Sequence, residues 1–311
     1  MVYELQVITQ RANNRLGELI NERLEWIKQR GYEVEIICER LDDDTDSLIF
    51  RLYLPDRDEG VFRIEDITYI CKHQLAEAIA EHIVTAWESR LLWREIQRTC
   101  RAFPPGDKAR LLSKAEEFMK CCHSSESLNL LMNFGRKSRI ASRILGYIED
   151  APQLVVEGFI TFWMQDYLTE IKFAVEVAIE ELRNEKEYND FVNLLRYFVE
   201  TQPPKIQEVN LLMSSNGVFY LWDSAGSKID DNYIEYYLED MLFEEIDLDD
   251  VLVSILVTIA PRRIVIHENN PLPSKESVTM IRNVFQDRIV TCQGCERCGQ
   301  LKGHEAGLRR P

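Results

Sequence analysis

Residues 1–60 alternate between a strand pattern and a helix pattern. Apolar and polar residues alternate in three short runs, and a fourth run repeats its leucines and isoleucines at the helical period. The helical run ends in Lys28 and Arg30, and Gly31 follows them, which is typical of a helix C-terminus. The pattern predicts a small β-α-β-β unit with strands at residues 3–9, 32–38 and 47–54 and a helix at residues 13–30.

Residues 61–205 are predicted to form a helical bundle. Apolar residues recur at intervals of four in one long pattern, as in Leu75, Ile79 and Ile83, and the prolines Pro104 and Pro105 end it. The expected helical segments are residues 64–103, residues 107–150, and two aromatic-rich helices in residues 152–201 that the polar residues 183–190 separate.

After residue 205 the strand pattern returns. Asn216-Gly217 lies between two apolar runs, which is a strong signal for a β-hairpin. A strand, a helix and a strand at the end of this region predict a β-α-β crossover, in which the two strands are normally parallel. The expected elements are hairpin strands at residues 209–213 and 218–222, a very acidic amphipathic helix at residues 229–250, and a crossover made of residues 263–267, 275–285 and 288–292.

These patterns predict an α+β fold that is predominantly helical. The sequence divides into a small N-terminal β-α-β-β unit, a central helical bundle, and a C-terminal domain with a hairpin and a β-α-β unit. The predicted boundaries are residues 1–60, 61–205 and 206–300, with a flexible tail at residues 301–311.

The charge of the chain disfavours two classes of partner. The 311 residues carry a net charge of −16, and phosphate binding relies on lysine and arginine, so nucleic acid and anionic membranes are poor partners. The N-terminus has no signal-peptide pattern, and no apolar run reaches the roughly 18–20 residues that a membrane span needs. We therefore expect a cytoplasmic protein whose cysteines are reduced.

A basic cluster interrupts the helical region. Arg136, Lys137, Arg139 and Arg143 follow Phe134-Gly135, and such a cluster can hold an anion or an acidic partner. More often, a run of this kind is a solvated face that pairs with nearby carboxylates. Both interpretations remain open from the sequence.

The segment with the clearest chemistry is the cysteine knuckle, residues 292–298, in which Cys292, Cys295 and Cys298 have the spacing C-x2-C-x2-C. Parallel strands that are joined by a crossover end at the same edge of a sheet, so His267 and Cys292 should lie close together. We therefore predict His267 as the fourth ligand of a metal, with His304 as the alternative.

Zinc fits this donor set, because thiolates with one imidazole are a common tetrahedral ligand group. A [4Fe–4S] cluster also fits the spacing, but residue 302 is lysine where the bacterial pattern continues with a fourth cysteine. A redox-active dithiol and three free thiols without a cofactor remain open as well.

The C-terminal region also resembles a known family. Residues 255–267, which end in Arg-Ile-Val-Ile-His, the helix residues 281–285 and residues 287–295, which contain Arg-Ile-Val-Thr-Cys-Gln-Gly-Cys, resemble the YtxC-like family of sporulation-associated proteins of spore-forming Firmicutes. The helical middle and the acidic residues 233–240 are similar in character, so the resemblance extends over residues 60–295. It implies a role in the mother cell or the forespore, and it brings no established activity and no catalytic residue.

The sequence therefore favours a non-enzymatic structural or interaction protein with a zinc-stabilised cysteine knuckle and an unidentified protein partner. The alternative is an Fe–S or redox protein that uses the same cysteines. A carboxylate di-metal enzyme is disfavoured, because none of His73, His82 and His123 follows a glutamate at the Glu-x-x-His spacing. The oligomeric state is not predicted.

Overall fold

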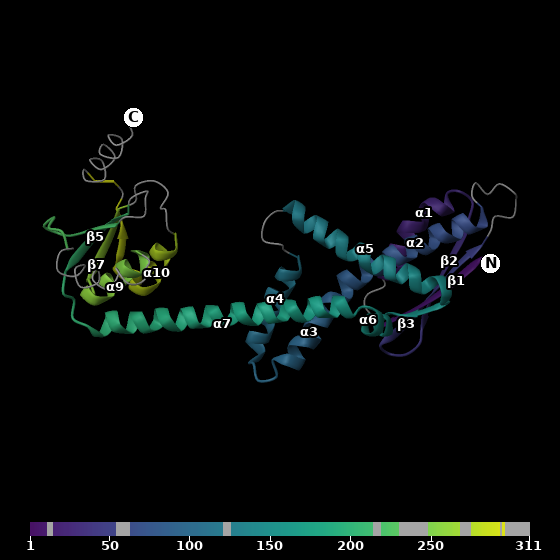
Figure 1. The fold of residues 1–311 in the computed structure, drawn as a ribbon, viewed down its shortest axis with the longest axis horizontal. Coiled ribbons are helices and arrows are strands. Elements are labelled where there is room, and N and C mark those ends of the chain that lie inside the picture. Colours follow the sequence, from purple (N-terminus) through teal and green to yellow (C-terminus); the bar gives the residue numbers. More distant parts are fainter. Residues whose placement is uncertain are drawn as a thin grey trace, which may run out of the picture. The chain divides into compact units, whose positions relative to one another are not determined.

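The computed structural model describes residues 1–10, 15–53, 63–120, 126–213, 219–229, 248–267, 275–292, 294 and 295 (Figure 1). The chain divides into two compact units, Met1–Arg183 and Asn184–Pro311. The fold is α+β and predominantly helical, as predicted. The boundaries predicted at residues 60, 205 and 300 stay predictions.

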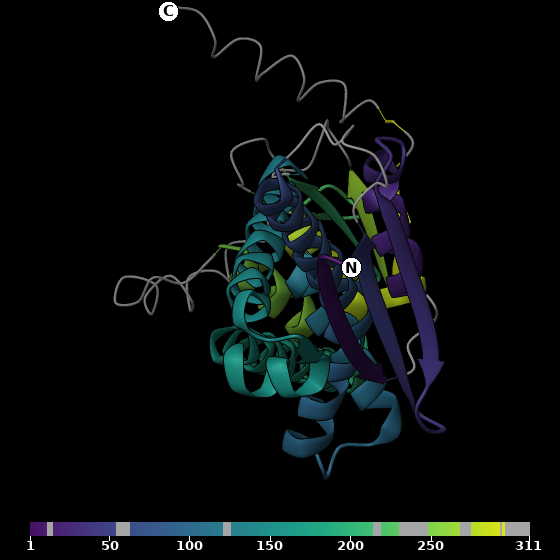
Figure 2. The same cartoon turned by 90° about the vertical axis from the view of Figure 1, so that its right-hand side faces the viewer.

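The first unit contains a four-stranded sheet in the order β2-β3-β1-β4. The predicted β-α-β-β unit is present, with β1 antiparallel to β3 and β3 antiparallel to β2, and the strands lie side by side in Figure 2. The fourth strand was not predicted, because its three residues lie in a segment, residues 152–201, whose pattern is helical. It pairs with β1 in the parallel direction. The elements are β1 (Tyr3–Gln10), α1 (Arg15–Lys28), β2 (Glu33–Arg40), β3 (Thr45–Tyr53) and β4 (Gln153–Val155).

Helices bury one face of this sheet. Leu16, Ile20 and Leu24 of α1 belong to the same core as Leu5 and Phe50 of the strands. The long helical pattern from residue 64 is confirmed, and it contains a π-helical turn that the sequence did not reveal. The helices of this unit are α2 (Ile64–His82), the π-helix η1 (Ile83–Trp87), α3 (Glu88–Thr99), α4 (Pro105–Lys120), α5 (Glu126–Asp150), α6 (Val156–Trp163) and the beginning of α7 (Gln165–Thr201).

The interruption predicted at residues 183–190 is wrong. Helix α7 runs without a break from Gln165 to Thr201, and the separation from α6 lies at Met164, whose backbone is not helical. The polar stretch contains no proline or glycine and is rich in glutamate, lysine and arginine, which are good helix formers. Its polarity therefore indicates exposure to solvent and not the end of a helix.

The second unit contains a four-stranded sheet in the order β6-β5-β7-β8. The predicted hairpin is confirmed, because β5 and β6 are antiparallel. The predicted crossover is also confirmed, because β7 and β8 are parallel neighbours, and β5 pairs with the other edge of β7. The elements are β5 (Glu208–Met213), β6 (Phe219–Asp223), α9 (Leu248–Ile259), β7 (Arg263–His267), α10 (Lys275–Phe285), the 3-10 helix η2 (Gln286–Arg288) and β8 (Ile289–Thr291).

The core of the second unit covers one face of its sheet. Val209 and Leu211 of β5 and Ile264 and Ile266 of β7 pack in one cluster with residues of α9 and α10, such as Leu256. Because side chains alternate along a strand, the residues between these positions point to the opposite face. That opposite face carries the candidate site.

Several predicted features lie outside the described residues. Most of the acidic helix predicted at residues 229–250 falls on residues 230–247, and the tail falls on residues 301–311. Cys298 and His304 also lie outside the described part of the chain. Among the helices that are described, none combines the length and the apolar character of a membrane-spanning helix.

Candidate metal centre

The crossover brings three potential metal ligands together. His267 is the last residue of β7, and Cys292 follows β8 directly, where its N–H donates a hydrogen bond of 2.8 Å to the carbonyl oxygen of Ile266. Cys295 returns toward the same edge. One donor atom from each of His267, Cys292 and Cys295 lies within 4.8 Å of the other two. In the described residues, this is the one such group of three histidine, cysteine or acidic side chains.

The two cysteines are held in a tight turn at the surface. Gly294 has a φ of +115°, a conformation that side-chain-bearing residues rarely adopt, and its N–H donates to the Cys292 sulfur at 3.4 Å. Cys292 is partly exposed and Cys295 is exposed, so the turn lies at the surface of the unit. The glycine noted in the sequence thus shapes the turn between the two thiols.

The imidazole of His267 points one nitrogen at the cysteines and the other at an amide. Its Nδ1 lies 3.6 Å from the Cys295 Sγ, and its Nε2 lies 3.0 Å from Oδ1 of Asn210 on β5. Tetrahedral zinc, with bonds of about 2.3 Å to sulfur and about 2.0–2.1 Å to nitrogen, separates two such donors by about 3.5–3.6 Å. The spacing of this nitrogen and sulfur therefore fits a shared zinc ion.

Two residues near the site were missed in the sequence. Asn210 interrupts the apolar run Val209–Met213 of β5, and Trp222 of β6 packs its ring against the His267 ring, with centroids 5.1 Å apart. A buried polar residue inside an apolar strand normally has a hydrogen-bond partner, and that signal could have drawn attention to Asn210. Neither residue belongs to a sequence motif with His267, because it is the pairing of the strands that brings them close to it.

The basic cluster lies on α5 in the first unit, apart from this site in the sequence. Arg136 is 8% exposed, and its guanidinium lies 3.3 Å from the Glu88 carboxylate and donates to the Met119 carbonyl oxygen at 3.2 Å. The Tyr167 hydroxyl donates to the same Glu88 carboxylate at 3.0 Å. Burial raises the pKa of Glu88, and Arg136 opposes that shift. Arg136 is therefore the cation of a buried polar network and not a surface charge.

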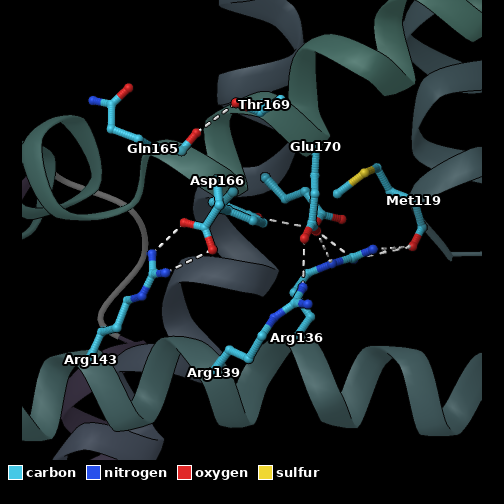
Figure 3. A network of polar contacts seen from close by, with 10 residues as sticks. Met119, Arg136, Arg139, Arg143, Gln165, Asp166, Thr169 and Glu170 are labelled. Carbon is cyan, nitrogen blue, oxygen red and sulfur yellow. Dashed lines mark hydrogen bonds and ion pairs between the residues drawn. The ribbon is translucent and has the colours of Figure 1, made fainter.

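The other three basic residues also pair with carboxylates, and Figure 3 shows Arg139 beside Glu170 and Arg143 beside Asp166. Lys137 lies 2.5 Å from Glu81, and Arg139 lies 2.6 Å from Glu170. Arg143 contacts both carboxylate oxygens of Asp166, and its hydrogen bonds lower the pKa of that carboxyl group. Each of these three positive charges is therefore balanced by a neighbouring carboxylate. The anion or partner role of Arg136, Lys137, Arg139 and Arg143 stays a prediction.

Comparisons with known proteins agree with the resemblance seen in the sequence. Residues 73–290 match the model of the YtxC-like family. A curated relative, "Uncharacterized protein YtxC" of Bacillus subtilis (strain 168), is 26% identical over 168 residues, which are 51% of this chain and 55% of that protein. The chain thus spans about half the length of this relative. No solved structure matches the chain.

The family match covers most of the helical region and three of the strands of the second unit. It includes Asn210, Trp222 and His267 and ends at residue 290, two residues before Cys292. The match extends over more than half of the sequence, and the predicted resemblance is confirmed. The chain belongs to the YtxC-like family.

Proposed function

We propose that this protein is a non-enzymatic structural or interaction protein whose C-terminal unit binds Zn²⁺ through His267, Cys292 and Cys295. Cys298 completes the four ligands in this proposal, and His304 is the alternative to His267. The observation that carries the proposal is the distance of 3.6 Å between the His267 Nδ1 and the Cys295 Sγ, which fits two ligands of one tetrahedral ion.

A metal at this place would connect the ends of two strands to the turn that follows them. His267 ends β7, Cys292 follows β8, and Cys295 belongs to the turn, so one ion would hold three points of the backbone. A ligand that binds only the folded state, at a free concentration of 100 times its Kd, adds about 2.7 kcal/mol to stability. The expected role is therefore to fix the edge of the sheet for contact with a protein partner.

The alternative is an Fe–S or redox protein that uses the same cysteines. Two unburied thiols on one turn, with sulfur atoms within 4.8 Å, can also form a reversible disulfide. We also propose the role in sporulation that the sequence resemblance implies, in the cytoplasm of the mother cell or the forespore.

Protein purified without oxygen is expected to contain close to one zinc per chain, without visible colour. Cys295→Ser is expected to lose most of this zinc, because one of three described ligands is removed. The matched control is Cys38→Ser, since Cys38 is an exposed cysteine of the first unit and far from the site in the sequence. Elemental analysis and the visible spectrum measure both effects.

Each other outcome of this experiment has a definite meaning. Iron with sulfide absorbance would replace the zinc proposal by the Fe–S alternative. A colourless, metal-free protein that forms a Cys292–Cys295 disulfide under mild oxidation would favour the redox alternative. Equal zinc content in Cys295→Ser and Cys38→Ser would place the metal elsewhere.

Gly294→Ala is expected to weaken zinc binding about 5- to 150-fold. A residue forced into an unfavourable backbone conformation costs on the order of 1–3 kcal/mol, and Gly294 has a φ of +115° with open space around the added Cβ. The control is Gly146→Ala in α5, where an added Cβ also meets nothing within 4 Å and φ is not positive. Competition with a chromogenic chelator measures the affinity, and equal affinities of the two variants would contradict this account of the turn.

A further inference from the structure

Asn210 is placed to act on the candidate metal centre from the adjacent strand. It lies in the middle of β5, pairs with Trp222 on β6 and Val265 on β7, and is 9% exposed. Because the side chains of Val209 and Leu211 point into the core, that of Asn210 points to the opposite face, where His267 also lies. A buried amide is costly unless its polar atoms are hydrogen-bonded, so its partners define its role.

The partners of Asn210 determine which way its amide faces. The Nδ2 donates to the backbone carbonyl oxygen of Asp223 at 3.4 Å, which leaves Oδ1 directed at His267. An amide oxygen only accepts hydrogen bonds, so the Nε2 of His267, 3.0 Å away, carries the hydrogen. In a neutral imidazole, the other nitrogen then holds a lone pair. That nitrogen is Nδ1, which faces the Cys295 sulfur at 3.6 Å.

Trp222 restricts the imidazole from a second direction. Its ring is tilted by 30° to the His267 ring at a centroid distance of 5.1 Å. An imidazole that is hydrogen-bonded at one edge and packed on one face has little freedom to turn its Nε2 toward the cysteines. Asn210 of β5 and Trp222 of β6, which are paired across the hairpin, thus keep the His267 ring in one orientation.

We propose that Asn210 is a positioning residue that fixes the tautomer of His267 and so makes Nδ1 the metal-binding atom. This inference rests on the proposed zinc site. Residues that hydrogen-bond a ligating histidine typically change metal affinity by 10- to 100-fold when they are replaced. The hairpin β5–β6 is therefore part of the metal centre, although it supplies no ligand.

Two substitutions at Asn210 test the role of its hydrogen-bond acceptor. Asn210→Leu removes the acceptor and keeps the branching of the side chain, and we expect zinc affinity to fall 10- to 100-fold. Asn210→Asp keeps an acceptor at the same place, and we expect affinity to remain within a few-fold of wild type or to rise. The control is Asn193→Leu, an exposed asparagine on α7 in the same unit, which should leave affinity unchanged.

The tautomer is measured separately from the metal. In metal-free protein with ¹⁵N-labelled histidine at pH 8, the two-bond nitrogen–proton couplings of His267, assigned by their loss in His267→Gln, report which nitrogen carries the hydrogen. Wild type and Asn210→Asp should show the Nε2–H form, and Asn210→Leu should lose this preference.

An unchanged tautomer in Asn210→Leu, or unchanged zinc affinity in that variant, would overturn the inference. A different outcome would separate the two proposals. If neither the wild type nor any variant binds zinc, the proposed function fails. If the tautomer of His267 still depends on Asn210 in that case, the action of Asn210 on His267 stands.

Discussion

Arg136→Leu is expected to lower the free energy of unfolding of the first unit by about 3–5 kcal/mol, because removal of one partner from a buried ion pair leaves the other charge uncompensated. The charge left without its partner is the carboxylate of Glu88, which is 7% exposed. The Met119 carbonyl oxygen also loses its donor. Urea unfolding followed by circular dichroism measures the change.

The same helix provides a matched control for this prediction. Arg139 lies one turn from Arg136, pairs with Glu170 at 2.6 Å, and has a side chain that is 60% exposed. Exposed ion pairs typically contribute about 0–1 kcal/mol, so Arg139→Leu should have a small effect. The double variant Arg136→Met with Glu88→Leu should recover part of the loss, because the uncompensated carboxylate is then absent. Equal losses for Arg136→Leu and Arg139→Leu would contradict the buried network.

His82 is expected to make the first unit less stable in mild acid. The side chain is 1% exposed, and its Nε2 has no hydrogen-bond partner. Burial, with a smaller contribution from the charge of Arg90, lowers the pKa of His82 from 6.5 to about 4. The folded protein therefore keeps the imidazole neutral at pH values where the unfolded chain takes up a proton.

The sign of the effect follows from proton binding. Above pH 6.5 both states are neutral at His82 and the full stability is present, whereas between pH 6.5 and about 4 the unfolded state binds more protons, so stability falls as the pH falls. The expected loss from this one group between pH 7.5 and pH 5 is about 2 kcal/mol. His82→Leu should lack this part of the pH dependence.

The control for His82 lies on the same helix. His73 is exposed, so His73→Leu should keep the wild-type dependence on pH. Urea unfolding of the three proteins at pH 7.5 and pH 5 tests this. If His82→Leu and wild type lose equal stability between the two pH values, the burial of a neutral His82 is not what destabilises the unit in acid.

The elements that the sequence predicted are those whose residues repeat over several periods. The hairpin strands around Asn216-Gly217 and the crossover strands of β7 and β8 have strong local patterns, and the structure has both. The crossover also explains why the sequence places His267 and Cys292 together, since parallel strands that a crossover joins end at one edge of the sheet.

The features that were missed depend on tertiary contacts. β4 has three residues and gains its role only from pairing with β1. Arg136 looks like its neighbours Lys137 and Arg139 in the sequence, but it alone of the three is buried, because of where α5 packs. Asn210 contacts His267 across 57 positions of the chain, and no local pattern encodes such a contact.

The pairing of β1 with β4 has a consequence for the order of folding during synthesis. β1 ends at Gln10 and can pair with β3 once Tyr53 has been made, but its other edge has no partner until residues 153–155 emerge. At about 5–20 residues per second, translation leaves that edge open for on the order of ten seconds. An unpaired strand edge is a template for pairing with another chain. The nascent protein thus passes through an interval in which aggregation competes with completion of its first sheet.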